Sequence, residues 1–213
     1  MAASLTTGIG KGGGVPPIGS GWGGGGGGPH GHGGSRRASF TGLWVLLAAI
    51  IMFFAALVSV YVVRRGISDD WVATPLPSLI WWSTGILLAS SAALEIARRA
   101  LRNGRRVQFN GWWLAGTTLG LGFLAAQYMT WQVLWESGYY MASNPSSAMF
   151  YVLTAAHGVH LLGGIIALLY VALQAVRLRL GPGKRTIADV STAYWHFMDG
   201  LWVFLLVLFL VRG

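Results

Sequence analysis

The sequence contains no cysteine and few charged residues. The complete absence of cysteine from its 213 residues excludes disulfide bonds, thiolate nucleophiles and zinc–thiolate sites. Only 10% of the residues are charged and 54% are hydrophobic. A typical soluble domain carries about 25% charged residues. The mean hydropathy of +0.57 agrees with this balance, which indicates a protein that resides in lipid rather than in water.

Acidic residues are the scarcest charged group. The chain has six Asp and Glu residues against 15 Lys and Arg residues, which gives a formal net charge of +9. In a membrane protein such an excess of basic residues gathers in the cytoplasmic loops and sets the orientation of the chain. We therefore expect membrane lipids rather than nucleic acid as the partner of these charges.

The first part of the chain lacks any apolar periodicity. Residues 1–39 are rich in Gly, Pro and Ser, and such a segment cannot bury enough surface to offset the entropy lost on ordering. We predict a disordered cytoplasmic tail over 1–39 and a transmembrane domain over 40–213. His30 and His32 are predicted to be solvated. The apolar run that starts at Phe40 is too long for a signal peptide.

Five long apolar runs follow the tail. Each is near or above the roughly 20 residues that a helix needs to cross about 30 Å of hydrocarbon. Short connections between the runs force consecutive helices to be antiparallel. The sequence therefore predicts an all-α membrane protein, a bundle of five transmembrane helices over residues 40–63, 77–97, 112–135, 148–176 and 189–211.

Basic residues are distributed unequally between the two sides of the predicted helix bundle. All except Arg64, Arg65 and Arg212 fall before the first helix or in the second and fourth connections. The positive-inside rule then predicts a cytoplasmic N-terminus and a C-terminus on the opposite side. Several tryptophans fall near the predicted interfaces and are expected to form an aromatic belt: Trp71, Trp81, Trp82, Trp112, Trp113 and Trp135.

Ionisable and amide side chains inside the predicted spans are few. Glu95 precedes Arg98 and Arg99 by three and four residues, which favours an interfacial ion pair over a buried proton-relay carboxylate. Gln127 lies deep in the third span, where a buried amide needs a hydrogen-bond partner on a neighbouring helix. Gln127 therefore marks an inward-facing side of that helix.

The last two spans each carry a polar pair. His157 and His160 lie in LTAAHGVHLLGG, and His196 and Asp199 lie in AYWHFMDGLW. At a rise of about 1.5 Å per residue on antiparallel helices, Asp199 is level with His157 and His196 is level with His160. We predict a polar layer that joins these two helices through the four side chains.

Three roles for this layer remain open from the residues alone. It can be a structural hydrogen-bond layer that fixes helix register, a proton- or ion-handling site, or a site for metal or haem. Three histidines and a carboxylate suit zinc or iron, but a di-iron bundle needs more carboxylates at this depth than Asp199 alone. The first span contributes no ionisable residue to a proton pathway.

Two stretches and one shorter segment resemble a known family. FYVLTAAHGVHLLGG (150–164) resembles the motif F-x-x-T-x-x-H-G-x-H of the cytochrome c oxidase subunit III family, and STAYWHFMDGLWVFLL (191–206) resembles its final-helix motif Y-W-H-F-x-D-x-x-W. GFLAAQ (122–127) resembles the middle-helix segment that ends in Gln. The matching positions are Gln127, Thr154, His157, Gly158, His160, Tyr194, Trp195, His196, Phe197, Asp199 and Trp202.

This resemblance implies a non-catalytic third subunit of a haem-copper terminal oxidase, in its short five-helix bacterial form. The complex would reduce oxygen to water, with its haem and copper in partner subunits and no catalytic or metal-binding residue in this chain. The implied partners are subunit I as the main contact, subunit II, other respiratory subunits and bound phospholipid. The implied roles are to stabilise subunit I, hold lipid in a cleft and support proton uptake, in the bacterial inner membrane.

Two departures from the family pattern affect the proton-related role. The family commonly has a buried acid near the position of Ala49–Ile50, and it often has a glutamate shortly after the glutamine, where this chain has Thr130 and Trp131. Two alternatives follow. One is an accessory subunit of a nitric oxide reductase-type relative. The other is a small proton- or metal-handling membrane protein built on the His–Asp layer.

Overall fold

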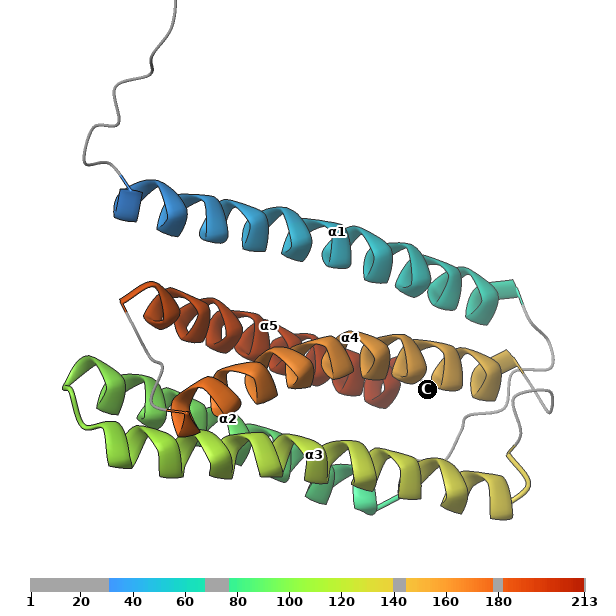
Figure 1. Cartoon of the computed structure of the whole chain (residues 1–213). Helices are drawn as coiled ribbons and strands as arrows, with labels where there is room; N and C mark the ends of the chain where they lie inside the picture. The colour runs from blue at the N-terminus through green and yellow to red at the C-terminus, as the bar shows by residue number, and fades with distance from the viewer. Residues whose placement is uncertain (1–30, 68–76, 140–144, 178–181, 213) are drawn as a thin grey trace, which may run out of the picture. The chain divides into compact units, whose positions relative to one another are not determined.

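A computed structural model describes residues 31–67, 77–139, 145–177 and 182–212, and within these ranges the chain is entirely helical apart from short turns. The prediction of an all-α protein with five helices is confirmed (Figure 1). Each helix is longer than predicted: α1 spans Gly31–Ile67, α2 Leu79–Arg102, α3 Arg106–Glu136, α4 Pro145–Val176 and α5 Pro182–Arg212. Most of the predicted tail, residues 1–30, lies outside the described residues.

The start of α1 differs from the sequence prediction. The helix begins at Gly31, whereas the predicted tail extended to residue 39. No proline interrupts residues 31–39, so the backbone hydrogen bonding of the apolar run continues into this polar stretch. The hydroxyl of Thr41, just after this stretch, donates a hydrogen bond of 3.0 Å to the carbonyl of Arg37 within it.

Four helices are long and apolar enough to cross a membrane: α1 from Arg37, α2, α4, and α5 from Arg185 to Val211. Helix α3 is not among them. It has the length, but glycine, threonine, glutamine and tryptophan replace much of its aliphatic surface and lower its hydropathy. The structure therefore establishes four candidate spans where the sequence predicted five.

Helices α2, α3, α4 and α5 form a ring of contacts in which each packs against two of the other three. Helix α1 packs only against α4 and α5 among the described residues. Consecutive helices in the ring are antiparallel. Ser83 and Ser90 of α2, for example, contact Gln127 and Gly116 of α3 in reverse order.

Helix α3 approaches its neighbours closely at two glycines. A Cβ atom at Gly120 would lie 2.7 Å from the ring of Trp195, and one at Gly116 would lie 2.7 Å from the side chain of Leu94. Trp195 and Leu94 are both fully buried. These glycines let the side chains of Leu94 on α2 and Trp195 on α5 lie directly against the α3 backbone, a close approach that small residues permit between membrane helices.

The turn that follows α2 and the turn that follows α3 each contain a glycine in the left-handed conformation. Gly104 has a φ of 73° and Gly138 a φ of 83°. After Gly104, the Arg105 amide donates to the Ala100 carbonyl at 2.9 Å, which terminates α2 in a Schellman arrangement. The three residues 103–105 thus turn the chain straight into the antiparallel α3.

Candidate functional site

His157 lies in a seam of aromatic side chains between α3, α4 and α5. It is 1% exposed, and its ring centroid is 5.2 Å from that of Trp202 and 6.4 Å from that of Phe123. Neither of its ring nitrogens has a hydrogen-bond partner among the described residues. His157 therefore contributes to this aromatic seam mainly as a flat ring.

Indole hydrogen bonds tie the aromatic seam to its surroundings. Trp202 is fully buried, and its Nε1 donates to the hydroxyl of Thr84 on α2 at 3.0 Å. Trp131 of α3 donates in the same way to the hydroxyl of Thr154 on α4 at 3.2 Å. Two motif residues, Trp202 and Thr154, thus each make a bond that joins two helices.

His160 faces a different neighbour. Its ring lies 5.7 Å from Phe53 and 5.5 Å from Phe54 on α1, and its Nδ1 is 2.8 Å from the Ala156 carbonyl. The backbone carbonyl of His160 accepts a 2.9 Å bond from the hydroxyl of Tyr194. The motif tyrosine therefore joins α5 to α4.

His196 and Asp199 face α2. His196 Nδ1 forms a hydrogen bond with the hydroxyl of Ser91, and its Nε2 lies 3.8 Å from a carboxylate oxygen of Glu95. Its Nδ1 is 4.0 Å from Asp199 Oδ2. Neither carboxylate oxygen of Asp199 has a hydrogen-bond partner among the described residues.

The structure divides the four residues of the predicted layer between three environments. It brings His196 and Asp199 together, places His157 in the aromatic seam and turns His160 towards α1. Residues three apart on a helix differ in direction by about 60°, so two histidines can face different neighbours. The predicted layer rests on the depth of each residue along its helix axis, and this depth does not determine the direction in which the side chain points.

An ion network extends from His196 along α2 and α5. Glu95 accepts bonds from Arg98 at 2.8 and 3.1 Å and from Arg99 at 3.0 Å, in the predicted pairing. Asp189 of α5, which the sequence analysis did not single out, lies 3.8 Å from Arg98 and 3.6 Å from Arg102. The carboxylate of Glu95 therefore connects this network to His196.

Four serine and threonine residues of α2 also lie at helix contacts that were not predicted from the sequence. Ser83 and Ser90 are seven residues apart, as are Thr84 and Ser91, so each pair shares a helix face. Ser90 donates to the Gly116 carbonyl at 2.8 Å. The amide of Gln127, 9% exposed, donates to the Ser83 hydroxyl at 3.1 Å. The seven-residue spacing of Ser83 and Ser90 is the feature of the sequence from which a hydrogen-bond partner for Gln127 could have been predicted.

One member of the expected aromatic belt is a core residue. Trp113 is fully buried, and its Nε1 donates to the Leu168 carbonyl at 3.0 Å. Its neighbour Trp112 is 44% exposed, and Trp81, Trp82 and Trp135 are also exposed. Adjacent helix positions point about 100° apart, which separates Trp112 from Trp113. Trp71 lies outside the described residues.

The structure gives no support to a metal site. In the described ranges, no three His, Asp or Glu side chains are grouped so that they could hold a metal ion. The ligand set considered from the sequence requires His157, His160 and His196 to converge, and they point in different directions. Zinc and iron sites need three or four converging ligands.

The polar group on α2 and α5 reaches the surface of the described helices. The side chain of His196 is 40% exposed, that of Arg98 27% and that of Glu95 23%. We call these three residues the ionisable patch. They lie within the candidate spans α2 and α5.

Comparison with known proteins agrees with this arrangement. The family model for cytochrome c oxidase subunit III matches residues 41–213. A probable cytochrome c oxidase subunit 3 of Nocardia farcinica is 29% identical over 76% of this chain and 82% of its own length. Cytochrome c oxidase subunit 3 of Corynebacterium diphtheriae is 30% identical over 78% and 84%, respectively. Quinol oxidase subunit 3 of Bacillus spizizenii is 27% identical over 79% and 84%.

The family match covers all five helices apart from the first residues of α1, and both histidine motifs fall inside it. The family comprises third subunits of respiratory haem-copper oxidases and carries no metal centre of its own. The chain belongs to the cytochrome c oxidase subunit III family in its bacterial form, a family of multi-pass proteins of the plasma membrane.

Proposed function

We propose that this chain is the non-catalytic subunit III that stabilises subunit I of a haem-copper oxidase, and that the ionisable patch is its main contact with subunit I. The exposure of His196 carries this proposal. Ionisable groups within a bilayer are costly and almost always face protein. A histidine that is 40% exposed beside Glu95 and Arg98 therefore favours a protein cover over this face.

The redox chemistry is assigned to the partners. Haem and copper would lie in subunits I and II, and the complex would reduce oxygen to water with electrons from cytochrome c or quinol. The relatives named above are oxidase subunits, which favours an oxidase over the nitric oxide reductase alternative. Subunit II and other respiratory subunits would contact this chain outside the ionisable patch.

Helix α3 is proposed to be the fifth span. Its 31 residues would extend about 46 Å at 1.5 Å per residue, which exceeds the hydrocarbon thickness. It also lies along α2 from Ser90 to Ser83, a helix that is itself a candidate span. The proposed orientation, with the N-terminus in the cytoplasm, rests on the distribution of Lys and Arg.

Lipid binding is supported by an apolar cavity between α1 and α5. Its volume is about 700 Å³, and Ile51, Phe54, Val58, Leu201 and Phe204 are among the residues that line it. No charged side chain lines it among the described residues. A cavity of this chemistry within two candidate spans suits the acyl chain of a phospholipid.

Support of proton uptake is the second proposed role, and the ion network favours it. Titratable and basic groups lead from Arg102 at the end of α2, through Asp189 and Glu95, to His196 and Asp199 inside the span. The carboxylate that the family commonly has on the first helix is absent here, and Glu95 on α2 supplies one beside the motif histidine. The same network is the basis for the rival hypothesis of a small proton-handling protein.

Two histidine variants of the whole complex test the proposed contact. His196→Phe removes the ionisable group from the exposed patch, whereas His157→Phe replaces a ring in the aromatic seam and is the matched control. We expect the first variant to lower the haem-containing subunit recovered per copy of this chain in mild detergent by about tenfold, the equivalent of 1.4 kcal/mol. Haem absorption and quantitative mass spectrometry measure this ratio.

Equal recovery with both variants would contradict the proposed contact. Purification of the chain by itself supplies a second check. A Soret band that remains with the isolated chain would overturn the assignment of haem to its partners.

A further inference from the structure

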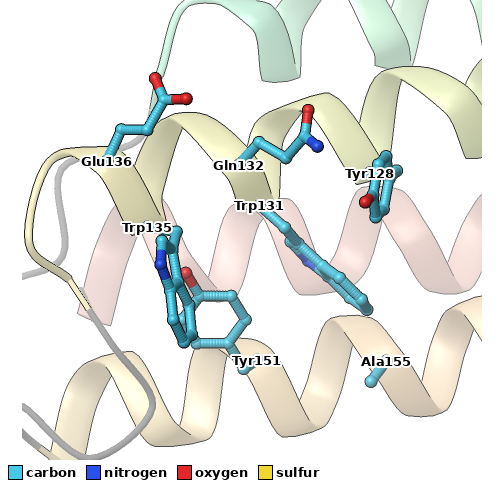
Figure 2. A pocket seen from close by; sticks show the side chains of 7 residues that line it. All are labelled: Tyr128, Trp131, Gln132, Trp135, Glu136, Tyr151 and Ala155. Atoms are coloured by element: carbon cyan, nitrogen blue, oxygen red, sulfur yellow. The ribbon is translucent and has the colours of Figure 1, made fainter.

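We propose that the groove between α3 and α4 binds the ammonium headgroup of a membrane phospholipid at the end of α3 and one of its acyl chains further along. The inference rests on the proposed lipid-binding role and adds a second site with a different chemistry. The cavity at the end of α3 has a volume of about 540 Å³. Its lining residues are Tyr128, Trp131, Gln132, Trp135, Glu136, Tyr151 and Ala155 (Figure 2).

Aromatic rings form one side of this cavity. Figure 2 shows Trp131 and Trp135 of α3 extending toward α4, with Tyr151 of α4 beside them, whereas Gln132 and Glu136 extend from the other edge of α3. Faces of tryptophan and tyrosine rings attract ammonium groups, with a preference for tryptophan. The cavity thus offers aromatic faces on one side and a carboxylate on the other.

Hydrogen bonds hold two of these rings in place. Trp131 donates to the Thr154 hydroxyl at 3.2 Å, and the Tyr151 hydroxyl donates to the Tyr139 carbonyl at 3.0 Å. The rings of Trp131 and Tyr151 pack edge to face, with centroids 6.0 Å apart. Because the rings are already ordered, a ligand loses little free energy in arranging them.

The charge of the cavity favours a cation. Glu136 is the only charged side chain among the described residues that line it. Glu136 is also the last residue of α3, and the helix dipole places a partial negative charge at this C-terminal end. An anionic headgroup would meet this carboxylate without a basic side chain to balance it.

A second cavity indicates that the ligand also has an apolar part. It has a volume of about 310 Å³ and shares Tyr128, Trp131 and Ala155 with the first. It continues between α3 and α4 as far as Phe123 and Leu162. From Ala155 to Leu162 the groove extends about 10 Å along α4 at 1.5 Å per residue.

This continuity distinguishes a phospholipid from a lysine or arginine of a partner subunit. A basic side chain would occupy only the cavity beside Glu136, whereas an amphiphile with a cationic head and an apolar chain would occupy both cavities. The groove also differs from the cavity between α1 and α5, where the described lining contains no charged residue.

The test compares two headgroups on the intact oxidase complex. The complex is stripped of lipid in detergent and titrated with phosphatidylethanolamine or phosphatidylglycerol of identical acyl chains, and native mass spectrometry measures the lipid bound. We expect the complex to prefer phosphatidylethanolamine by about three- to tenfold, because its ammonium group would contact both an aromatic face and a carboxylate.

Variants then locate the preference. Glu136→Gln removes the charge and Trp135→Leu removes an aromatic face, and each should abolish the headgroup preference. Trp82→Leu is the matched control, because Trp82 is 75% exposed and lies outside the cavity. Equal binding of both lipids by the parent complex, or a preference that survives Glu136→Gln and Trp135→Leu, would overturn the inference.

The outcomes separate this inference from the proposed function. If the complex binds both lipids without preference, lipid binding stands and the ammonium site is rejected. If neither lipid binds, both proposals are rejected. If Trp135→Leu releases the haem-containing subunit while Trp82→Leu does not, the groove is a protein interface and the lipid site is rejected.

Discussion

His157 and His196 come from consecutive helices and from the two family motifs, but their surroundings differ in exposure and in chemistry. His157 is 1% exposed and lies among the rings of Trp202 and Phe123. His196 is 40% exposed and lies beside Glu95 and Asp199. His157 serves as a planar ring that packs in the aromatic seam. At position 196 the ionisable group of the histidine is exposed at the surface of the described helices.

This comparison separates residues that hold the bundle together from residues available to a partner. Substitutions that truncate a ring of the aromatic seam should therefore lower the stability of the chain itself, whereas replacing one ring by another, as in His157→Phe, should change it little. Substitutions in the ionisable patch should change its association and leave its folding nearly unchanged.

The largest expected effect is in the aromatic seam. Trp202→Ala removes a fully buried indole, its contact with His157 and its bond to Thr84, and truncation of a buried aromatic residue costs about 3–5 kcal/mol. Thermal unfolding of the complex in detergent measures the loss. Trp82→Ala is the control, since Trp82 is 75% exposed. Similar melting temperatures for both variants would show that the seam does not stabilise the bundle.

An intermediate effect is expected where the ring of Trp195 on α5 contacts the backbone of α3 at Gly120. Gly120→Ala places a methyl group 2.7 Å from the buried ring of Trp195, and overpacking of this kind costs about 1–3 kcal/mol. Gly122→Ala, on the same helix, meets its nearest neighbour at 3.8 Å and should be nearly neutral. Equal unfolding temperatures for the two alanine variants would argue against the close helix contact.

The smallest effect is expected at the outer end of the ion network. Arg102 is 59% exposed and lies 3.6 Å from Asp189, and exposed ion pairs contribute about 0–1 kcal/mol. Arg102→Ala should therefore change the unfolding temperature little, and raising the salt concentration should reduce the difference further. A loss as large as that of Gly120→Ala would show that the network supports the fold as well as an interface.

Helix number and type could be predicted from the sequence because a bilayer restricts the options. A chain inside hydrocarbon must satisfy its backbone hydrogen bonds internally, so long apolar runs become helices. The level of each histidine along its helix was also accessible. The direction in which each side chain points was not, because it depends on contacts made only when helices pack. Trp113 and Asp189 illustrate this limit: their partners, Leu168 and Arg98, lie on other helices.

The turn of three residues between α2 and α3 has a consequence for how the protein enters a membrane. Helix α3 has too little hydropathy to count as a span by itself, and α2 has the lowest value among the four candidates. When the two helices are paired, polar groups of each find hydrogen-bond partners on the other. The Ser90 hydroxyl donates to the Gly116 carbonyl, and the Gln127 amide donates to the Ser83 hydroxyl. A hairpin of α2 and α3 would therefore carry the Gln127 NH2 group into hydrocarbon already hydrogen-bonded, which either helix alone could not do.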